Sequence, residues 1–100
     1  MKNFFSPNAI TVASLAISWS NIADDAAIFT AARNIINRSN ATAYSMGFGH
    51  PYIYQNYAAL EQPVFDSYGA MNKQKLVEIH QKYDPNGVFT KLQPGYFKIA

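Results

Sequence analysis

Three tyrosines, an asparagine and a glutamine fall within the nine residues from His50 to Ala58, which read HPYIYQNYA. Phenols and amides can hydrogen-bond a ligand, and a phenolate can accept a proton from one. Each such group costs about 1–3 kcal/mol when it is buried without a hydrogen-bond partner. Pro51 also disfavours a helix that runs through the segment. The segment is therefore expected on the surface or in the lining of a site.

Two backbone geometries would orient these side chains differently. In an extended strand, residues two apart share a side, so Tyr52, Tyr54 and Asn56 would point together. Tyr57 would then point the other way. If the chain turns at Asn56 instead, Tyr54 and Tyr57 could converge on one ligand. Composition alone fits either a wall that binds a ring or a domain interface, and it favours the interface.

Other patterns that could do chemistry are weak. The chain has no cysteine, which removes disulfides, thiolate catalysis and thiolate metal sites. His50 and His80 lie far apart in the sequence without a third ligand, so no metal site is expected. Gly47 and Gly49 lack the remaining residues of a dinucleotide-binding fingerprint and indicate a flexible helix exit. The tyrosine segment is left as the candidate site.

The balance of charged and apolar residues indicates a chain that contacts another protein surface. Charged residues make up 14% of the 100 residues and apolar residues 49%, whereas an average soluble domain has about 25% charged residues. A chain of this length makes at most one domain and buries only part of its surface. We therefore expect apolar surface that meets another domain or subunit.

The same composition argues against two classes of partner. The formal net charge of +2 is scattered along the chain and forms no basic stripe, which disfavours nucleic acid. No apolar run reaches the roughly 18 residues that a membrane-spanning helix needs. Neither nucleic acid nor a membrane is expected as a partner, and the sequence indicates no cellular location.

The first half of the chain predicts a strand and then an amphipathic helix. Residues 10–19 are rich in Ile, Val, Leu and Trp, and Ser6-Pro7-Asn8 interrupts the apolar run, which favours a strand over a secretory signal. Asn21 lies where an N-cap belongs, and Asp24-Asp25 fall in the first turn, so helix capping explains these carboxylates better than acid/base chemistry. The expected buried stripe comprises Ile22, Ala26, Phe29, Ala32 and Ile36, widened by Ile28 and Ile35.

The second half predicts one further helix and a tail. Asp66 or Ser67 can cap the helix, and Asp84-Pro85-Asn86-Gly87 ends it. Its expected buried stripe comprises Leu76, Ile79 and Tyr83. Residues 88–100 contain the turn signal Pro94-Gly95 and predict a tail that packs along a neighbour.

Several short motifs occur in a recognisable order. They are Trp19-Ser20-Asn21 followed by Asp24-Asp25, then PYIYQNYA, Tyr68-Gly69 followed by Asn72, KYDPNGVF and LQPGYF. From about Ala9 onward, this order resembles the C-terminal end of fungal FAD-linked oxidases of the berberine bridge enzyme-like group, which belongs to the vanillyl-alcohol oxidase superfamily of FAD-binding PCMH-type oxidoreductases.

The resemblance implies an α+β fold class. The chain would be a partial domain of one or two strands and two main helices. Residues 1–49 would close a substrate domain, with the strand followed by the amphipathic helix. Residues 50–100 would form a berberine-bridge-like segment, with the Tyr-x-Asn-Tyr loop, a helix and a tail. That segment would return to an FAD-binding domain that this chain lacks.

The resemblance also implies roles for individual residues. Asn56 would help to hold FAD, and Tyr57 would face the substrate as the catalytic base. Tyr54 and Tyr52 would line the wall of the flavin and substrate site, and Asn72 would also contact the cofactor. Because a free tyrosine has a pKa near 10, a base at neutral pH needs a hydrogen bond or a positive charge that stabilises its phenolate.

The complete protein would, by this resemblance, oxidise a small organic substrate in fungal secondary metabolism. A hydride would pass from the substrate to FAD, and oxygen would reoxidise the flavin. The expected partners are the small-molecule substrate and the FAD-binding domain, in cis or in trans. We expect the chain alone to be inactive and to bind no FAD. The alternative is a stand-alone remnant that has lost catalysis and serves as an interaction module.

Overall fold

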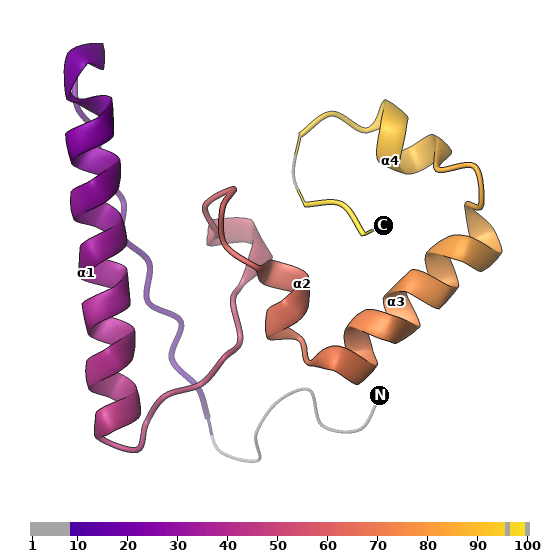
Figure 1. Ribbon diagram of the computed structural model, residues 1–100, viewed down its shortest axis with the longest axis horizontal. Coiled ribbons are helices and arrows are strands. Elements are labelled where there is room, and N and C mark those ends of the chain that lie inside the picture. The colour runs from indigo at the N-terminus through magenta and orange to yellow at the C-terminus, as the bar shows by residue number, and fades with distance from the viewer. Residues whose placement is uncertain (1–8, 96, 100) are drawn as a thin grey trace. The chain divides into compact units, whose positions relative to one another are not determined.

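The computed structural model describes residues 9–95 and 97–99, and within these ranges the secondary structure is entirely helical (Figure 1). The segments are the 3₁₀ helix η1 (Ile22–Asp24), α1 (Asp25–Ser45), the 3₁₀ helix η2 (Gln55–Tyr57), α2 (Val64–Ser67), α3 (Ala70–Tyr83) and α4 (Val88–Leu92). The chain divides into two compact units. One contains residues 13–50, and the other contains residues 9–12 with the described residues from Pro51 onward.

The structure does not confirm the strand that the sequence predicts over residues 10–19. Residues 9–19 have no regular secondary structure, and Val12, Leu15 and Ile17 are 42–49% exposed. A strand needs a neighbour that pairs with its backbone N–H and C=O groups, and the described part of the chain offers no second strand. The α+β prediction is thus confirmed only in its helices. Residues 6–8, which argue against a secretory signal, lie outside the described ranges.

The start of α1 follows the sequence prediction. The Asn21 side-chain oxygen accepts the Ala23 N–H at 3.0 Å and caps η1, which leads directly into α1. Asp25, in the first turn of α1, accepts the indole N–H of Trp19 at 2.7 Å. The Trp19 ring in turn meets Phe29 edge to face, with centroids 5.4 Å apart. Local packing therefore accounts for Asp25, whereas the Asp24 side chain makes no capping hydrogen bond.

The half-buried face of α1 contains only part of the predicted stripe. Ile28, Ala32 and Ile36 are half-buried. Ile22 and Phe29, by contrast, are 83% and 54% exposed. The unit of residues 13–50 has no second long helix or sheet that could cover the rest of the stripe.

Gly47 and Gly49 give α1 a defined C-terminal cap rather than the flexible exit expected from the sequence. Gly47 has a φ of 78°, its N–H bonds to the Tyr44 carbonyl at 3.1 Å, and the Phe48 N–H bonds to the Ala43 carbonyl at 2.9 Å. This pair of hydrogen bonds is the Schellman motif, in which a left-handed residue is usually glycine. Gly49 packs against the Tyr44 ring, because a Cβ at Gly49 would lie 2.3 Å from the ring carbons.

The helix that the sequence predicts between its cap at Asp66 or Ser67 and its end at residues 84–87 starts later, as α3, and a separate short helix, α2, precedes it. Gly69, with a φ of 88°, separates them and lies at the N-cap of α3, a backbone conformation that favours glycine. Neither residue proposed as a cap has that role for α3. Asp66 forms an ion pair with Lys73 at 2.5 Å, and the Ser67 hydroxyl bonds to backbone groups outside α3.

The buried stripe predicted for the second helix is only partly correct. Leu76 is half-buried, but Ile79 and Tyr83 are 53% and 72% exposed. The stripe is rotated relative to the prediction, and α2 is a separate helix that contacts α3. The half-buried side chains of α3 are Asn72, Lys73, Leu76, Val77 and His80.

A short helix, α4, occupies the first part of the predicted tail. The Asp84 carboxylate accepts the Val88 N–H at 2.8 Å and the Phe89 N–H at 3.0 Å, which satisfies donors that a helix start leaves open. Gly87 is buried, with a φ of 65°. The sequence Asp84-Pro85-Asn86-Gly87 therefore ends one helix and begins the next. Tyr96, in the LQPGYF motif, lies outside the described residues.

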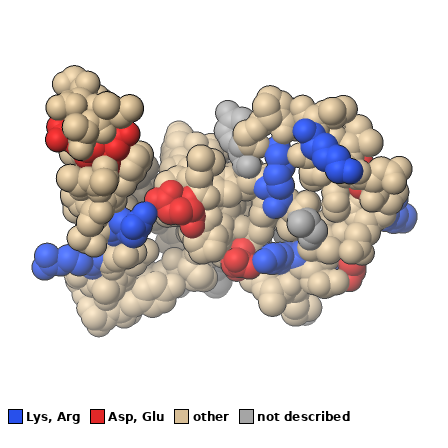
Figure 2. Space-filling model, turned by 45° about the horizontal axis from the view of Figure 1, so that its top comes forward, with Lys and Arg blue, Asp and Glu red and all other residues tan. Residues whose placement is uncertain are grey.

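Charged side chains are interspersed on the visible surface. On the face drawn in Figure 2, lysines and arginines occur among acidic and uncharged residues without a continuous region of one sign. None of the helices in the described ranges is both long enough and apolar enough to cross a membrane. The absence of nucleic-acid and membrane partners stays a prediction.

Candidate functional site

The turn from Tyr54 to Tyr57 brings three of the predicted site residues together. The Tyr57 N–H bonds to the Tyr54 carbonyl at 3.1 Å and closes η2. The two tyrosine rings meet edge to face, with centroids 5.0 Å apart and planes at 89°. The Asn56 amide nitrogen donates to the Tyr54 hydroxyl at 2.8 Å. Of the two geometries that the sequence leaves open, the structure shows the turn, in which Tyr54 and Tyr57 converge.

The turn leaves polar atoms available for a ligand. Tyr57 is 69% exposed and Tyr54 36%. Within residues 9–95 and 97–99, the Tyr57 hydroxyl makes no hydrogen bond and the Asn56 side-chain oxygen accepts none. The described residues also place no cation on the Tyr57 hydroxyl. A group that stabilises a Tyr57 phenolate would have to come from outside them.

Tyr52 and Asn72 lie in a second cluster, which is centred on Tyr68. The Tyr52 ring stacks on Tyr68 with centroids 6.0 Å apart and planes at 27°, and Phe65 meets Tyr68 edge to face at 5.8 Å. The Asn72 amide nitrogen donates to the Tyr68 carbonyl at 2.8 Å. Burial, and then the charge of Tyr52, raise the pKa of Tyr68 above its ordinary value of 10.0, so its phenol is protonated at neutral pH.

The structure therefore separates the predicted site residues into two groups. Tyr54, Asn56 and Tyr57 contact one another in the turn, whereas Tyr52 and Asn72 both contact Tyr68. The cofactor contact of Asn72 stays a prediction, and the observed role of its amide is to hold the backbone between α2 and α3.

Ser67, predicted from the sequence as a helix cap, instead bonds to the tyrosine segment. The Ile53 N–H donates to the Ser67 hydroxyl oxygen at 3.0 Å, and the Ser67 hydroxyl donates to the Val64 carbonyl at 2.5 Å. The sequence suggested that Ser67 caps a helix, and this link to the tyrosine segment was missed. Gly69 could have indicated a helix break after Ser67, but no local signal indicates the link to Ile53.

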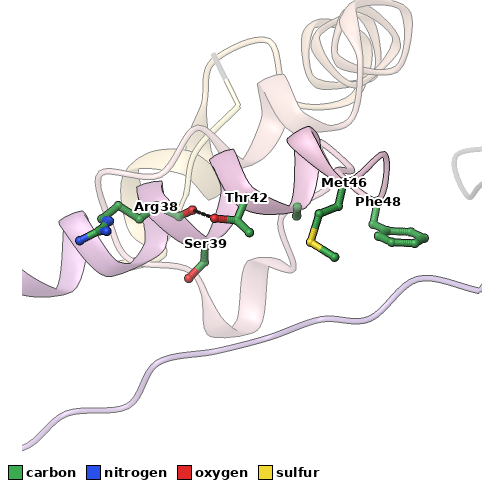
Figure 3. A pocket seen from close by; sticks show the side chains of 6 residues that line it. Arg38, Ser39, Thr42, Met46 and Phe48 are labelled. Carbon is green, nitrogen blue, oxygen red and sulfur yellow. Dashed lines mark hydrogen bonds between the residues drawn. The ribbon is translucent and has the colours of Figure 1, made fainter.

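A shallow hollow lies at the C-terminal end of α1, away from the tyrosines in sequence (Figure 3). Figure 3 shows Met46 and Phe48 next to one another, and the Thr42 hydroxyl bonded to the Arg38 carbonyl at 2.9 Å. Its lining is Arg38, Ser39, Thr42, Ala43, Met46 and Phe48. These side chains include no acid–base pair, and the described residues contain no group of three potential metal ligands. The hollow therefore suggests no chemistry of its own.

A protein-family comparison matches the segment that holds the Tyr54–Tyr57 turn and Tyr68. Residues 53–94 match the family model described as berberine and berberine like. The match includes the turn, α2, α3 and α4. The fold and the site thus define a chain with a helical berberine-like segment.

Curated fungal proteins are similar to nearly the whole chain. The chain is 39% identical over 90 residues to FAD-dependent monooxygenase tpcD of Cochliobolus heterostrophus. It is 38% identical over 90 residues to FAD-dependent monooxygenase FUP4 of Fusarium proliferatum. Each alignment covers 90% of this chain and 17% of the relative. It is 41% identical over 93 residues to oligopeptidase PhomG' of Diaporthe leptostromiformis, covering 91% of this chain and 8% of that protein. No solved structure matches at a significant level.

Residues 53–94 carry the berberine and berberine-like match, and the two FAD-dependent relatives are similar to 90% of the chain. The chain spans 8–17% of the length of these three relatives. The activity named for each relative can therefore depend on residues beyond the matched segment.

Proposed function

We propose that the chain is the C-terminal segment of an FAD-dependent oxidoreductase that oxidises a small organic substrate in fungal secondary metabolism. The observation that carries the proposal is the turn of Tyr54, Asn56 and Tyr57, which lies within the family-matched residues 53–94. Two relatives that are similar over 90% of the chain are named as FAD-dependent, which supports FAD as the cofactor.

The residues of the turn fit one edge of a flavin ring. A flavin offers a flat aromatic system next to N–H and C=O groups, which pair with aromatic and amide side chains. The edge-to-face rings of Tyr54 and Tyr57 supply the aromatic part, and the Asn56 side-chain oxygen supplies an acceptor. Asn56 would hold the cofactor, while its bond to Tyr54 fixes the orientation of the amide. FAD, when bound, would supply a two-electron acceptor for the substrate hydride, regenerated by oxygen.

Tyr57 would remove a proton from the substrate. The residue is 69% exposed and its hydroxyl makes no hydrogen bond to the described residues, so it can contact a substrate. An ionised tyrosine at neutral pH requires a stabilising hydrogen bond or positive charge. The FAD-binding domain, in cis or in trans, would provide this group, and the chain alone is therefore expected to be inactive.

The alternative proposal is a non-catalytic interaction module. The observation in its favour is that Val64, at 1% exposed, is the one fully buried apolar residue in the described ranges, while many large apolar side chains are exposed. Such a surface suits a chain that packs against a partner, with or without catalysis.

Expression of the complete gene product beside residues 1–100 alone tests these proposals. The complete protein should retain flavin absorbance after dialysis, and the 100-residue chain should not. A complete protein that binds no flavin would refute the oxidoreductase proposal and favour the interaction module. A chain of 100 residues that retains FAD would refute the need for a separate flavin domain.

Turnover under isotopically labelled oxygen then separates two reaction types. An oxidase should produce hydrogen peroxide and leave the product unlabelled. The names of the two FAD-dependent relatives describe monooxygenases, and a monooxygenase would instead place one labelled oxygen atom in the product.

A further inference from the structure

The Tyr54–Tyr57 turn is attached to α2 through the residues that precede it. The Ile53 N–H, directly before the turn, donates to the Ser67 hydroxyl at 3.0 Å. Tyr52, one residue earlier, stacks on Tyr68, which directly follows Ser67. These two contacts, between neighbouring residues on each side, join the tyrosine segment to the end of α2.

Ser67 is suited to this link because its hydroxyl donates and accepts at the same time. The hydroxyl proton goes to the Val64 carbonyl at 2.5 Å, which fixes the oxygen so that its lone pairs can receive the Ile53 N–H. Val64 is 1% exposed and is the fully buried apolar residue of the described ranges. The turn is therefore linked, through one hydroxyl, to the backbone of a fully buried residue.

We propose that Ser67 is a positioning residue, which holds the Tyr54–Tyr57 pair through the Ile53 amide. The consequence for catalysis rests on the function proposed above, whereas the positioning itself does not. Loss of the hydroxyl would leave the part-buried Ile53 N–H without its partner, and the turn could then leave the geometry in which the two rings meet.

Amide hydrogen exchange in the complete gene product tests the proposal with two Ser67 variants. Ser67→Ala removes the donor and the acceptor, and Ser67→Thr keeps both. The matched control is Ser45→Ala, because the Ser45 hydroxyl also donates to the carbonyl three residues before it, at 2.7 Å, without receiving a backbone amide. The amides to follow are those of Ile53, Tyr57 and Ala58, the last two being bonded within the turn.

Ser67→Ala should accelerate exchange about fivefold at Ile53 and also at Tyr57 and Ala58, the change expected for one lost hydrogen bond. Ser67→Thr should restore the parental rates, and Ser45→Ala should leave these amides unchanged. Acceleration confined to Ile53 would overturn the proposal, because the serine would then hold only its own partner. If Ser67→Ala does not fold, Ser67→Cys takes its place, because sulfur is a weak hydrogen-bond acceptor. Its exchange rates at the same three amides should then exceed those of Ser67→Thr.

Flavin absorbance of the same samples keeps the two proposals distinct. A colourless parent protein would refute the flavin proposal and leave the exchange result valid. A yellow parent whose turn amides do not respond to Ser67→Ala or Ser67→Cys would refute the positioning role alone.

Discussion

The Asn56 amide nitrogen lies 2.8 Å from the Tyr54 hydroxyl oxygen, and this bond orients the amide within the turn. A side-chain amide has separate donor and acceptor ends. With its nitrogen bonded to Tyr54, Asn56 offers its oxygen to a ligand. The same turn places the Tyr57 ring against Tyr54. Asn56, the proposed cofactor contact, and Tyr57, the proposed base, are therefore neighbours with different proposed roles.

Tyr57→Phe should leave flavin bound and slow its reduction by substrate. The ring still packs against Tyr54, and only the hydroxyl, which makes no bond to the described residues, is lost. The expected decrease is about 10²–10⁴-fold, the usual contribution of a positioned base. Anaerobic stopped-flow reduction of the complete protein, normalised to flavin content, measures it. Reduction at the parental rate would mean that the phenol only packs.

Asn56→Ala should lower flavin occupancy more than the rate per bound flavin. The substitution removes a hydrogen-bonding group from the cofactor rather than from the substrate. Tyr54→Phe is the matched variant, because it keeps the Asn56 amide but removes the hydroxyl that orients it. Its occupancy should fall less, by a change in affinity of about 0.5–1.5 kcal/mol for one neutral hydrogen bond. Equal occupancy in Asn56→Ala and the parent would contradict the assigned cofactor contact.

Local signals predicted the parts of the fold that depend on local contacts. Asn21 caps the turn before α1, and Asp25 lies in the first turn of that helix, as the sequence indicated. Local signals could not establish whether residues 10–19 form a strand, because strand formation requires pairing with another segment. Gly69 was visible in the sequence, but the helical spacing on both sides of it led to the prediction of one continuous helix.

The candidate site was predictable as a set of residues and not as a geometry. Residue types and the family resemblance indicated Tyr54, Asn56 and Tyr57, but spacing alone fitted a strand as well as a turn. The Ser67–Ile53 link joins residues 14 apart in the chain. Neither residue carries a local signal for the other, so only the structure could show it.

Gly47 and Gly49 should respond to alanine for different reasons. Gly47 has a φ of 78° with open space around it, so Gly47→Ala should cost about 1–2 kcal/mol of stability through the backbone alone. At Gly49 a Cβ would lie 2.3 Å from the Tyr44 ring, and overpacking of this kind costs about 1–3 kcal/mol.

A double-mutant cycle separates these two causes. Tyr44→Ala removes the ring and should relieve most of the cost of Gly49→Ala, while the cost of Gly47→Ala should persist. The measurement is the free energy of unfolding from denaturant titration of the three single and two double variants beside the parent. Additive effects for Tyr44→Ala and Gly49→Ala would show that ring contact does not set the requirement for glycine.

Tyr68 should make the stability of its unit decrease at high pH. Burial, with a smaller contribution from Tyr52, raises its pKa in the folded chain above the ordinary value of 10.0. The folded state therefore binds this proton more tightly than the unfolded state, and the stabilisation is fully present below about pH 10 and is lost as the pH rises through the raised pKa. Unfolding free energies between about pH 9 and pH 11, with near-ultraviolet absorbance of the phenolate, measure the effect. Tyr68→Phe should reduce this dependence, whereas Tyr52→Phe should leave most of it, because burial is the larger cause. An unchanged dependence in Tyr68→Phe would assign the high-pH loss to other groups.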